Sequence, residues 1–121
     1  MAVRKIGFVG FRAGDLEGLR RILEDGLGLR ATDISDRQVG YDLPDGTRVE
    51  GFSESEEFHS FFTTGPVVGF AVDDFDLALL RLTHLQVEFI TDVQSKNGEK
   101  WVHFRFPDGT IAEIIGPSRT A

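Results

Sequence analysis

His103 and Glu113 are the two residues of this sequence best suited to acid–base chemistry. They flank the segment Phe106–Thr110, whose Pro-Asp-Gly sequence predicts a tight turn between two strands. If Phe106 pairs with Thr110, the same register places His103 directly opposite Glu113. A carboxylate beside an imidazole orients the ring and favours its charged form, an arrangement used in general acid and base catalysis. The alternative is a cross-strand pair that contributes stability alone.

Strand alternation predicts which side chains share a face with this pair. Trp101 and Arg105 lie two residues to either side of His103 and are expected on the same face. Trp101 either stacks on a flat or cationic ligand or covers the edge of the sheet. The opposite face is predicted to form core against a helix, through Phe104, Phe106, Ala112 and Ile114.

An internal repeat predicts the elements that position these residues. The segment PDGTRVE at 44–50 recurs as PDGTIAE at 107–113. Upstream, FVGF at 8–11 precedes Asp15, and VVGF at 67–70 precedes Asp74. We therefore expect one domain over residues 1–121, made of module one (1–53), a linker (54–65) and module two (66–117).

Each module is predicted to run strand, helix, strand, strand, strand. The first helix is capped by Asp15, carries one apolar face and ends near Gly28; the second is capped by Asp73 or Asp74. The apolar positions are Leu16, Leu19, Leu23 and Leu27 in the first, and Phe75, Ala78, Leu79, Leu82 and Leu85 in the second. Later elements are a strand at 87–90, a polar loop at 94–100 and a closing hairpin from strands at 101–106 and 110–115.

A helix covers one face of its four strands, so the other face must meet something else. We expect an α+β fold in which two βαβββ modules form a cup-shaped mixed sheet with the helices on the convex face. The concave side is a natural ligand site. In the opening strands, alternation assigns Val9, Phe11, Val68, Phe70 and Val72 to core, and Phe8, Gly10, Arg12, Val67, Gly69 and Ala71 to the cup.

The linker is unexpectedly aromatic. Phe58, Phe61 and Phe62 surround His59 in SEEFHSFFTTGP. Such a cluster favours burial, either across a dimer or as one wall of the cup, which makes His59 a candidate ligand contact. His84, near the end of the second helix, receives no functional role.

Composition restricts the class of protein. Of the 121 residues, 40% are hydrophobic and 27% are charged, as in ordinary globular proteins. The net charge of −7 disfavours nucleic acid and anionic membranes as partners. The absence of cysteine excludes disulfides and thiolate metal sites, and the expected location is the cytoplasm.

The paired module starts, FVGFRAGDL and VVGFAVDDFD, and the paired ends, above all WVHFRFPDGTIAEIIG, resemble the glyoxalase, bleomycin-resistance and extradiol-dioxygenase superfamily. These proteins are also called vicinal oxygen chelate proteins. The resemblance covers nearly the whole chain. It implies paired βαβββ modules that form a cup, and a homodimer that often shares its cups between chains.

The resemblance also implies where a metal would bind. Metal-dependent members take His or Gln from the first strand of each module and Glu from the last. The matching first-strand positions here are Phe8 and Val67, which have no donor atoms, whereas Glu50 and Glu113 match the last-strand ligands. Two carboxylates without imidazole make a poor site for zinc, iron or nickel. Glu50 has the simpler alternative of pairing with an Arg or a backbone group.

The leading hypothesis is therefore a metal-free, bleomycin-resistance-like protein that needs no cofactor and binds a small aromatic or cationic molecule. The predicted ligand-binding residues are Phe8, Arg12, Glu50, His59, Val67, Trp101, His103, Arg105 and Glu113. The alternative is a lyase, isomerase or dioxygenase that holds a divalent metal on Glu50 and Glu113, with His59 or His103 as a further candidate ligand. A third hypothesis is metal-free acid–base catalysis by His103 with Glu113.

Overall fold

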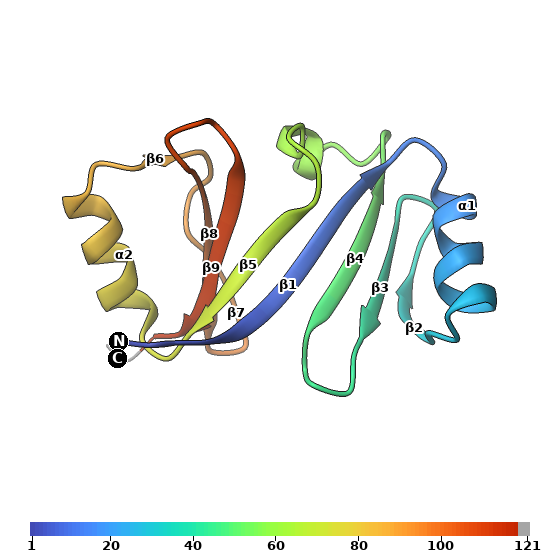
Figure 1. The fold of residues 1–121 in the computed structure, drawn as a ribbon, viewed down its shortest axis with the longest axis horizontal. Coiled ribbons are helices and arrows are strands. Elements are labelled where there is room, and N and C mark those ends of the chain that lie inside the picture. Colours follow the sequence, from blue (N-terminus) through green and yellow to red (C-terminus); the bar gives the residue numbers. More distant parts are fainter. Residues whose placement is uncertain (119–121) are drawn as a thin grey trace. The chain divides into compact units, whose positions relative to one another are not determined.

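The computed structural model describes residues 1–118 (Figure 1). Its secondary structure is α+β. The first half has the predicted βαβββ order, and the second half has the same order with one additional strand, β7, before its closing hairpin. The first half contains β1 (Val3–Ala13), α1 (Leu16–Arg20), the π-helical segment η1 (Arg21–Gly26), β2 (Ala31–Ile34), β3 (Gln38–Asp42) and β4 (Arg48–Ser53). The second contains β5 (Val67–Val72), α2 (Phe75–His84), β6 (Glu88–Phe89), β7 (Gln94–Lys96), β8 (Glu99–Arg105) and β9 (Ile111–Pro117). Between the halves lies a short 3₁₀ helix, η2 (Phe58–Phe61).

The chain divides into two compact units. Unit 1 combines residues 1–7 with the chain from residue 68 onward, and unit 2 comprises residues 8–67. In unit 2 the strand order is β2-β3-β4-β1, and in unit 1 the order β5-β9-β8-β6 is extended by β7, which pairs with β8. Each unit therefore contains both parallel and antiparallel strand pairs and one α-helix. In the described residues, no helix is long and apolar enough to cross a membrane.

The strand registers confirm the internal repeat. The opening and closing strands run parallel in both units, with Gly10 beside Glu50 in unit 2 and Gly69 beside Glu113 in unit 1. The closing hairpin of unit 1 has the predicted register, because the Phe106 backbone N–H donates to the Thr110 carbonyl at 2.8 Å. The corresponding hairpin of unit 2 pairs Gly40 with Glu50. Apart from the additional strand β7, the two copies thus share the order of their elements and the pairing of their opening and closing strands.

The first helix departs from its prediction. Asp15 caps it as expected, because its carboxylate accepts from the Gly18 backbone N–H at 2.9 Å. The helix then widens into η1, where the Leu27 N–H donates to the Ile22 carbonyl five residues back. A π turn rotates the later side chains away from the face predicted by a 3.6-residue period. The prediction of Leu27 as core is therefore wrong, and its side chain is 69% exposed.

The second helix supplies the core of unit 1. Asp74 is its N-cap and accepts from the Leu77 N–H at 3.2 Å. In Figure 1, α2 lies on one face of the sheet formed by β5, β9 and β8. The buried residues packed there are Val72, Phe75, Ala78, Val102, Phe104, Ala112 and Ile114. Burial of this set against the sheet confirms the predicted core face of β8 and β9.

Three predictions in the second module are wrong. Leu85 was expected on the apolar face of the second helix but is 75% exposed, because α2 ends at His84. Phe106 was expected in the core but is 42% exposed, because β8 ends at Arg105 and Phe106 already belongs to the turn. The predicted polar loop at 94–100 is largely a hairpin of β7 and β8. Its turn consists of Asn97 and Gly98, both with positive φ, a geometry that suits a two-residue hairpin.

The aromatic linker covers part of the helix-free face of unit 2. Phe62 is only 3% exposed and makes edge contacts with Phe8 and Phe52, at centroid distances of 6.5 and 5.7 Å. The β1 residue below it is Gly10, where an added Cβ would lie 2.6 Å from the Phe62 ring and 2.7 Å from the Phe8 ring. The absence of a side chain at Gly10 is what admits Phe62.

We therefore expect Gly10→Ala to lower the free energy of unfolding by about 1–3 kcal/mol, because a methyl group there overpacks buried rings. The matched control is Gly26→Ala, where an added Cβ meets nothing within 4 Å. The control should be neutral or slightly stabilising. Urea unfolding of both variants measures the effect, and equal stability of the two would contradict the packing described here.

Candidate functional site

The centre of the candidate site in unit 1 is the pair formed by His103 on β8 and Glu113 on β9. The two residues are direct cross-strand partners on the face opposite α2. Both are buried, with exposures of 1% for His103 and 4% for Glu113. Their Nε2 and Oε2 atoms lie 2.9 Å apart, although the ring N–H direction misses linear hydrogen-bond geometry. The pair is therefore best described as a close electrostatic contact.

Thr91 fixes the other side of the imidazole. Its hydroxyl oxygen accepts from the His103 backbone N–H at 3.0 Å and lies 3.4 Å from the ring Nδ1. A hydroxyl that already accepts a hydrogen bond is free to donate its own hydrogen, and Nδ1 is the nearby acceptor. In that tautomer the ring proton resides on Nε2, the nitrogen that faces Glu113.

Burial disfavours the charged form of the Glu113 carboxyl group. Burial raises the pKa of its carboxyl group, and the His103 contact opposes that rise only in part. Its second oxygen, Oε1, is buried and accepts no hydrogen bond from the described residues. A buried acceptor without a partner costs about 1–3 kcal/mol, and more when it is charged. This oxygen is the atom of the site that most needs a donor from outside the chain.

Trp101 and Arg105 flank the pair on the same face, as predicted. Trp101 lies opposite Ile115 and is partly exposed, so part of its ring surface is accessible. Arg105 is occupied locally, since it donates to the Gly109 carbonyl at 2.8 Å and to the Glu88 carboxylate at 3.1 Å. The geometry thus gives Arg105 a role in holding its hairpin turn.

Five of the predicted ligand-binding residues lie in unit 2, namely Phe8, Arg12, Glu50, His59 and Val67. Phe8 and Val67 are buried, with exposures of 7% and 0%. His59 stacks on Phe52 at a centroid distance of 3.6 Å, and its Nδ1 lies 2.7 Å from a Glu56 carboxylate oxygen. His59 is thereby part of the aromatic cluster that covers this face.

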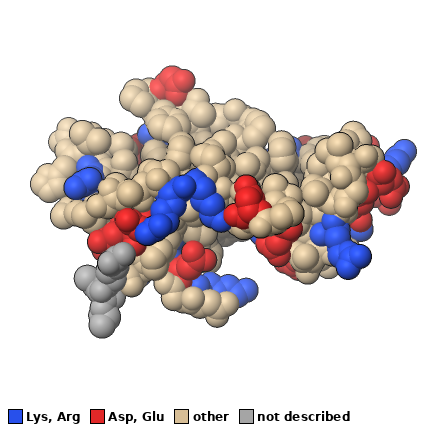
Figure 2. All heavy atoms as spheres, turned by 60° about the horizontal axis from the view of Figure 1, so that its bottom comes forward, with Lys and Arg blue, Asp and Glu red and all other residues tan. Residues whose placement is uncertain are grey.

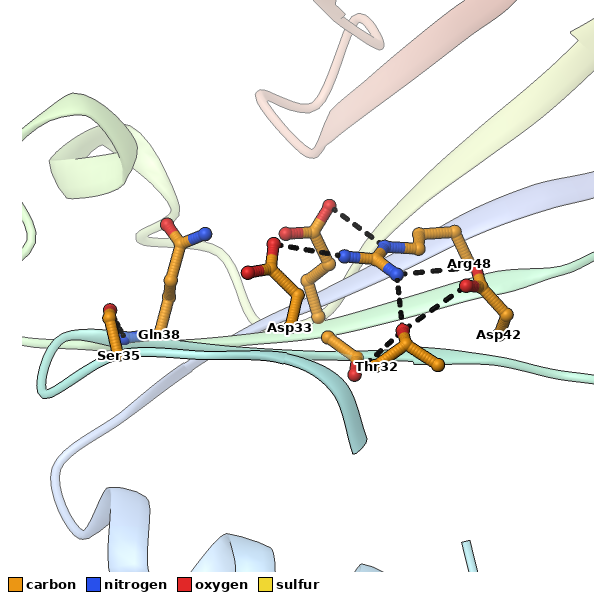
Figure 3. Close-up of polar contacts among 8 residues, drawn as sticks. Thr32, Asp33, Ser35, Gln38, Asp42 and Arg48 are labelled. Atoms are coloured by element: carbon orange, nitrogen blue, oxygen red, sulfur yellow. Dashed lines mark hydrogen bonds and ion pairs between the residues drawn. The ribbon is translucent and has the colours of Figure 1, made fainter. Parts of the chain in front are cut away.

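The alternative in which Glu50 pairs with an arginine is confirmed, because Arg48 lies beside it. Sequence reasoning did not identify Arg48 itself or the charged network around it. Its guanidinium lies 3.2 Å from Asp42, 3.4 Å from Asp33 and 3.5 Å from Glu50 (Figure 3). Figure 3 also shows Thr32 between Arg48 and Asp42, where it accepts from the guanidinium at 3.0 Å. A signal was present in the sequence, because strand alternation places residues 48 and 50 on one face.

Gly40 makes room for this network. A Cβ at that position would collide with the Arg48 guanidinium, which extends over the β3 backbone. The equivalent residue of the second copy, in the same register beside the closing glutamate, is His103. The two modules therefore surround equivalent glutamates with different partners.

The donor set does not fit the metal site that the superfamily resemblance implies. Phe8 and Val67 offer no donor atom at the first-strand positions. Glu50 lies beside the Arg48 guanidinium, and Glu113 lies beside His103. Residues 1–118 contain no group of three or more His, Asp or Glu side chains arranged to hold a metal ion.

Charges of both signs occur on the face drawn in Figure 2. In the view of Figure 2, Lys and Arg side chains lie next to Asp and Glu side chains, and neither sign forms a separate field on that face. Binding to a phosphate backbone requires clustered basic side chains, and this face does not present such a cluster.

Comparison with known proteins identifies the fold through structure alone. No family model and no curated protein sequence matches the chain. A methylmalonyl-CoA epimerase from Mycobacterium tuberculosis matches with a TM-score of 0.70 and 20% identity, over 96% of this chain and 89% of that one. A glyoxalase/bleomycin resistance protein/dioxygenase superfamily member from Vibrio splendidus matches with a TM-score of 0.69 and 18% identity, over 95% and 99%. A Streptomyces coelicolor methylmalonyl-CoA epimerase bound to 2-nitronate-propionyl-CoA gives 0.69 and 15%, over 98% and 100%.

The raised pKa of Glu113 predicts a specific pH dependence of stability. A carboxyl whose folded pKa exceeds its unfolded value of 4.5 stabilises the fold fully below that pH, and this contribution is lost as pH rises through the folded pKa. Because glutamine does not titrate, Glu113→Gln should gain stability relative to the wild type as pH rises above 4.5, and then level off.

Urea unfolding from pH 4 to pH 8 measures this difference. The control is Glu88→Gln, which removes a carboxylate that is 67% exposed and pairs with Arg105 at the surface. A Glu113→Gln curve that runs parallel to the wild type over the whole range would show that Glu113 titrates normally.

Proposed function

We propose that this chain, which has the fold of the glyoxalase, bleomycin-resistance and dioxygenase superfamily, binds a small aromatic or cationic molecule without a catalytic metal. The observation that carries the proposal is the buried Glu113 oxygen that accepts no hydrogen bond from the described residues. A ligand N–H group would satisfy that oxygen, and a ligand cation would also stabilise the ionised carboxylate.

Two neighbours of Glu113 support this choice of ligand. His103 holds one carboxylate oxygen and so leaves the other to face the ligand. Trp101, two residues from His103 on the same face, offers a partly exposed ring for stacking against a flat or cationic group. The similar structures fit a small-molecule role in general, since one epimerase is bound to 2-nitronate-propionyl-CoA.

The metal-free part of the proposal rests on the partners that the two glutamates already have within the chain. A divalent ion at either glutamate would have to displace Arg48 from Glu50 or compete with His103 for Glu113. No imidazole is present at the first-strand positions to compensate. The chain thus lacks the ligands that would favour a lyase, isomerase or dioxygenase of the metal-dependent type. We further propose that the protein is a homodimer in the cytoplasm, in keeping with the superfamily resemblance and the absence of cysteine.

Calorimetric titration with matched probes tests the ligand. Ethidium and bleomycin represent aromatic cations, and tryptamine is compared with tryptophol, which has the same indole ring but a neutral hydroxyl in place of the ammonium. The cations should bind, and Glu113→Gln should weaken them at least tenfold because a neutral amide replaces the carboxylate. Glu88→Gln serves as the matched control and should leave binding unchanged.

The same titrations are run after EDTA treatment and with added Zn²⁺, Mn²⁺ or Ni²⁺. Binding that persists in EDTA and does not improve with metal is the expected result. Tight stoichiometric binding of one of these metals, with no heat from any aromatic cation, would overturn the proposal in favour of the metal-dependent alternative.

A further inference from the structure

A pocket lies entirely within unit 2, at the end of β1. It has a volume of about 400 Å³, within the range of small-molecule sites. Its walls come from the end of β1, the residue that follows β4 and the last part of the linker. The lining residues on which the inference depends are Phe11, Arg12, Gly14, Glu54, Phe62 and Pro66.

Arg12 contributes an unneutralised positive charge to this pocket. Its Nη1 donates to the His59 carbonyl at 3.2 Å and its Nη2 to the Glu54 carbonyl at 3.0 Å. Both partners are neutral, and no carboxylate in residues 1–118 lies within ion-pair distance of the guanidinium. A guanidinium has five N–H donors, so three remain after these two bonds. Because the carbonyls already hold the side chain in place, an incoming anion would not have to order it.

Glu54 contributes the opposite charge. Its carboxylate makes no hydrogen bond or ion pair with any described residue, including Arg12, although both line the same pocket. The carboxylate lies close to the Gly14 backbone, since an added Cβ there would lie 3.0 Å from Oε1. The glycine therefore gives this carboxylate access to the end of β1 without a competing side chain.

Apolar side chains complete the pocket. Phe62 is buried and fixed by its contacts with Phe8 and Phe52, and Phe11 and Pro66 add further carbon surface. The pocket thus combines a held cation, an unpaired carboxylate and a rigid apolar wall.

We propose that this pocket binds a free α-amino acid with an apolar side chain. Its carboxylate pairs with Arg12, its ammonium group pairs with Glu54, and its side chain packs against Phe11 and Phe62. A simple anion would be repelled by Glu54 and a simple cation by Arg12, so a zwitterion is the ligand that satisfies both. The inference concerns unit 2 and does not depend on the site proposed at Glu113.

Calorimetric titration of the full chain with L-phenylalanine tests the proposal. 3-Phenylpropionate lacks the ammonium group and phenethylamine lacks the carboxylate, so both should bind at least tenfold more weakly than phenylalanine. Arg12→Gln and Glu54→Gln should each weaken phenylalanine at least tenfold. The matched controls are Arg30→Gln and Glu57→Gln, which remove exposed charges that do not line the pocket and should leave affinity unchanged.

The outcomes separate clearly. Failure of phenylalanine, leucine and methionine to bind at millimolar concentration would overturn the proposal, as would equal affinity for 3-phenylpropionate. Because Arg12 also ties the linker to β1, its variant is accompanied by a thermal melt. If Arg12→Gln does not fold, Glu54→Gln decides, and full phenylalanine affinity in that variant would overturn the proposal.

Discussion

The parallel pairing of the first and last strands of each module is the constraint on which the rest of this structure depends. It places Gly10 beside Glu50 and Gly69 beside Glu113. In both copies a closing glutamate thus lies next to a position with no side chain, on the face that the helix does not cover. The repeated strand pairing therefore places Glu50 and Glu113 at equivalent positions of the two copies.

The two copies differ in the residues that surround this glutamate. In unit 2, Gly40 lets Arg48 reach across the sheet, and Glu50 joins a network with Asp33 and Asp42. In unit 1, His103 occupies the equivalent register, and Glu113 is buried with one oxygen that accepts no hydrogen bond from the described residues. Burial without a full set of partners is costly for a carboxylate, and proteins retain such arrangements mainly where a site uses them. The asymmetry therefore supports the proposal that Glu113, rather than Glu50, contacts the ligand.

Local rules were sufficient for much of this fold. The PDGT turn and strand alternation together fixed the pairing of His103 with Glu113, because a turn of known length leaves one register that buries the apolar face. The π turn of η1 was not predictable, since Leu27 fits a helical period that the backbone abandons one turn earlier. The prediction for Phe106 was wrong for a similar reason, because the alternation of apolar residues continues one residue past the end of β8 at Arg105. The Arg48 network and the pocket of Arg12 and Glu54 depend on contacts between segments far apart in the sequence, which spacing within one segment does not encode.

The central claim is that Glu113 is a buried carboxyl with an oxygen that a ligand donor would satisfy. The pKa of the Glu113 carboxyl tests this claim most directly. A ¹³C NMR titration that follows the Glu113 side-chain carboxyl carbon, assigned by comparison with Glu113→Gln, reports this pKa in the intact protein. The account predicts a value above the ordinary 4.5 in the free protein, and a fall when a cationic ligand such as tryptamine binds and stabilises the charged form. A value at or below 4.5 that does not respond to any cation would contradict it.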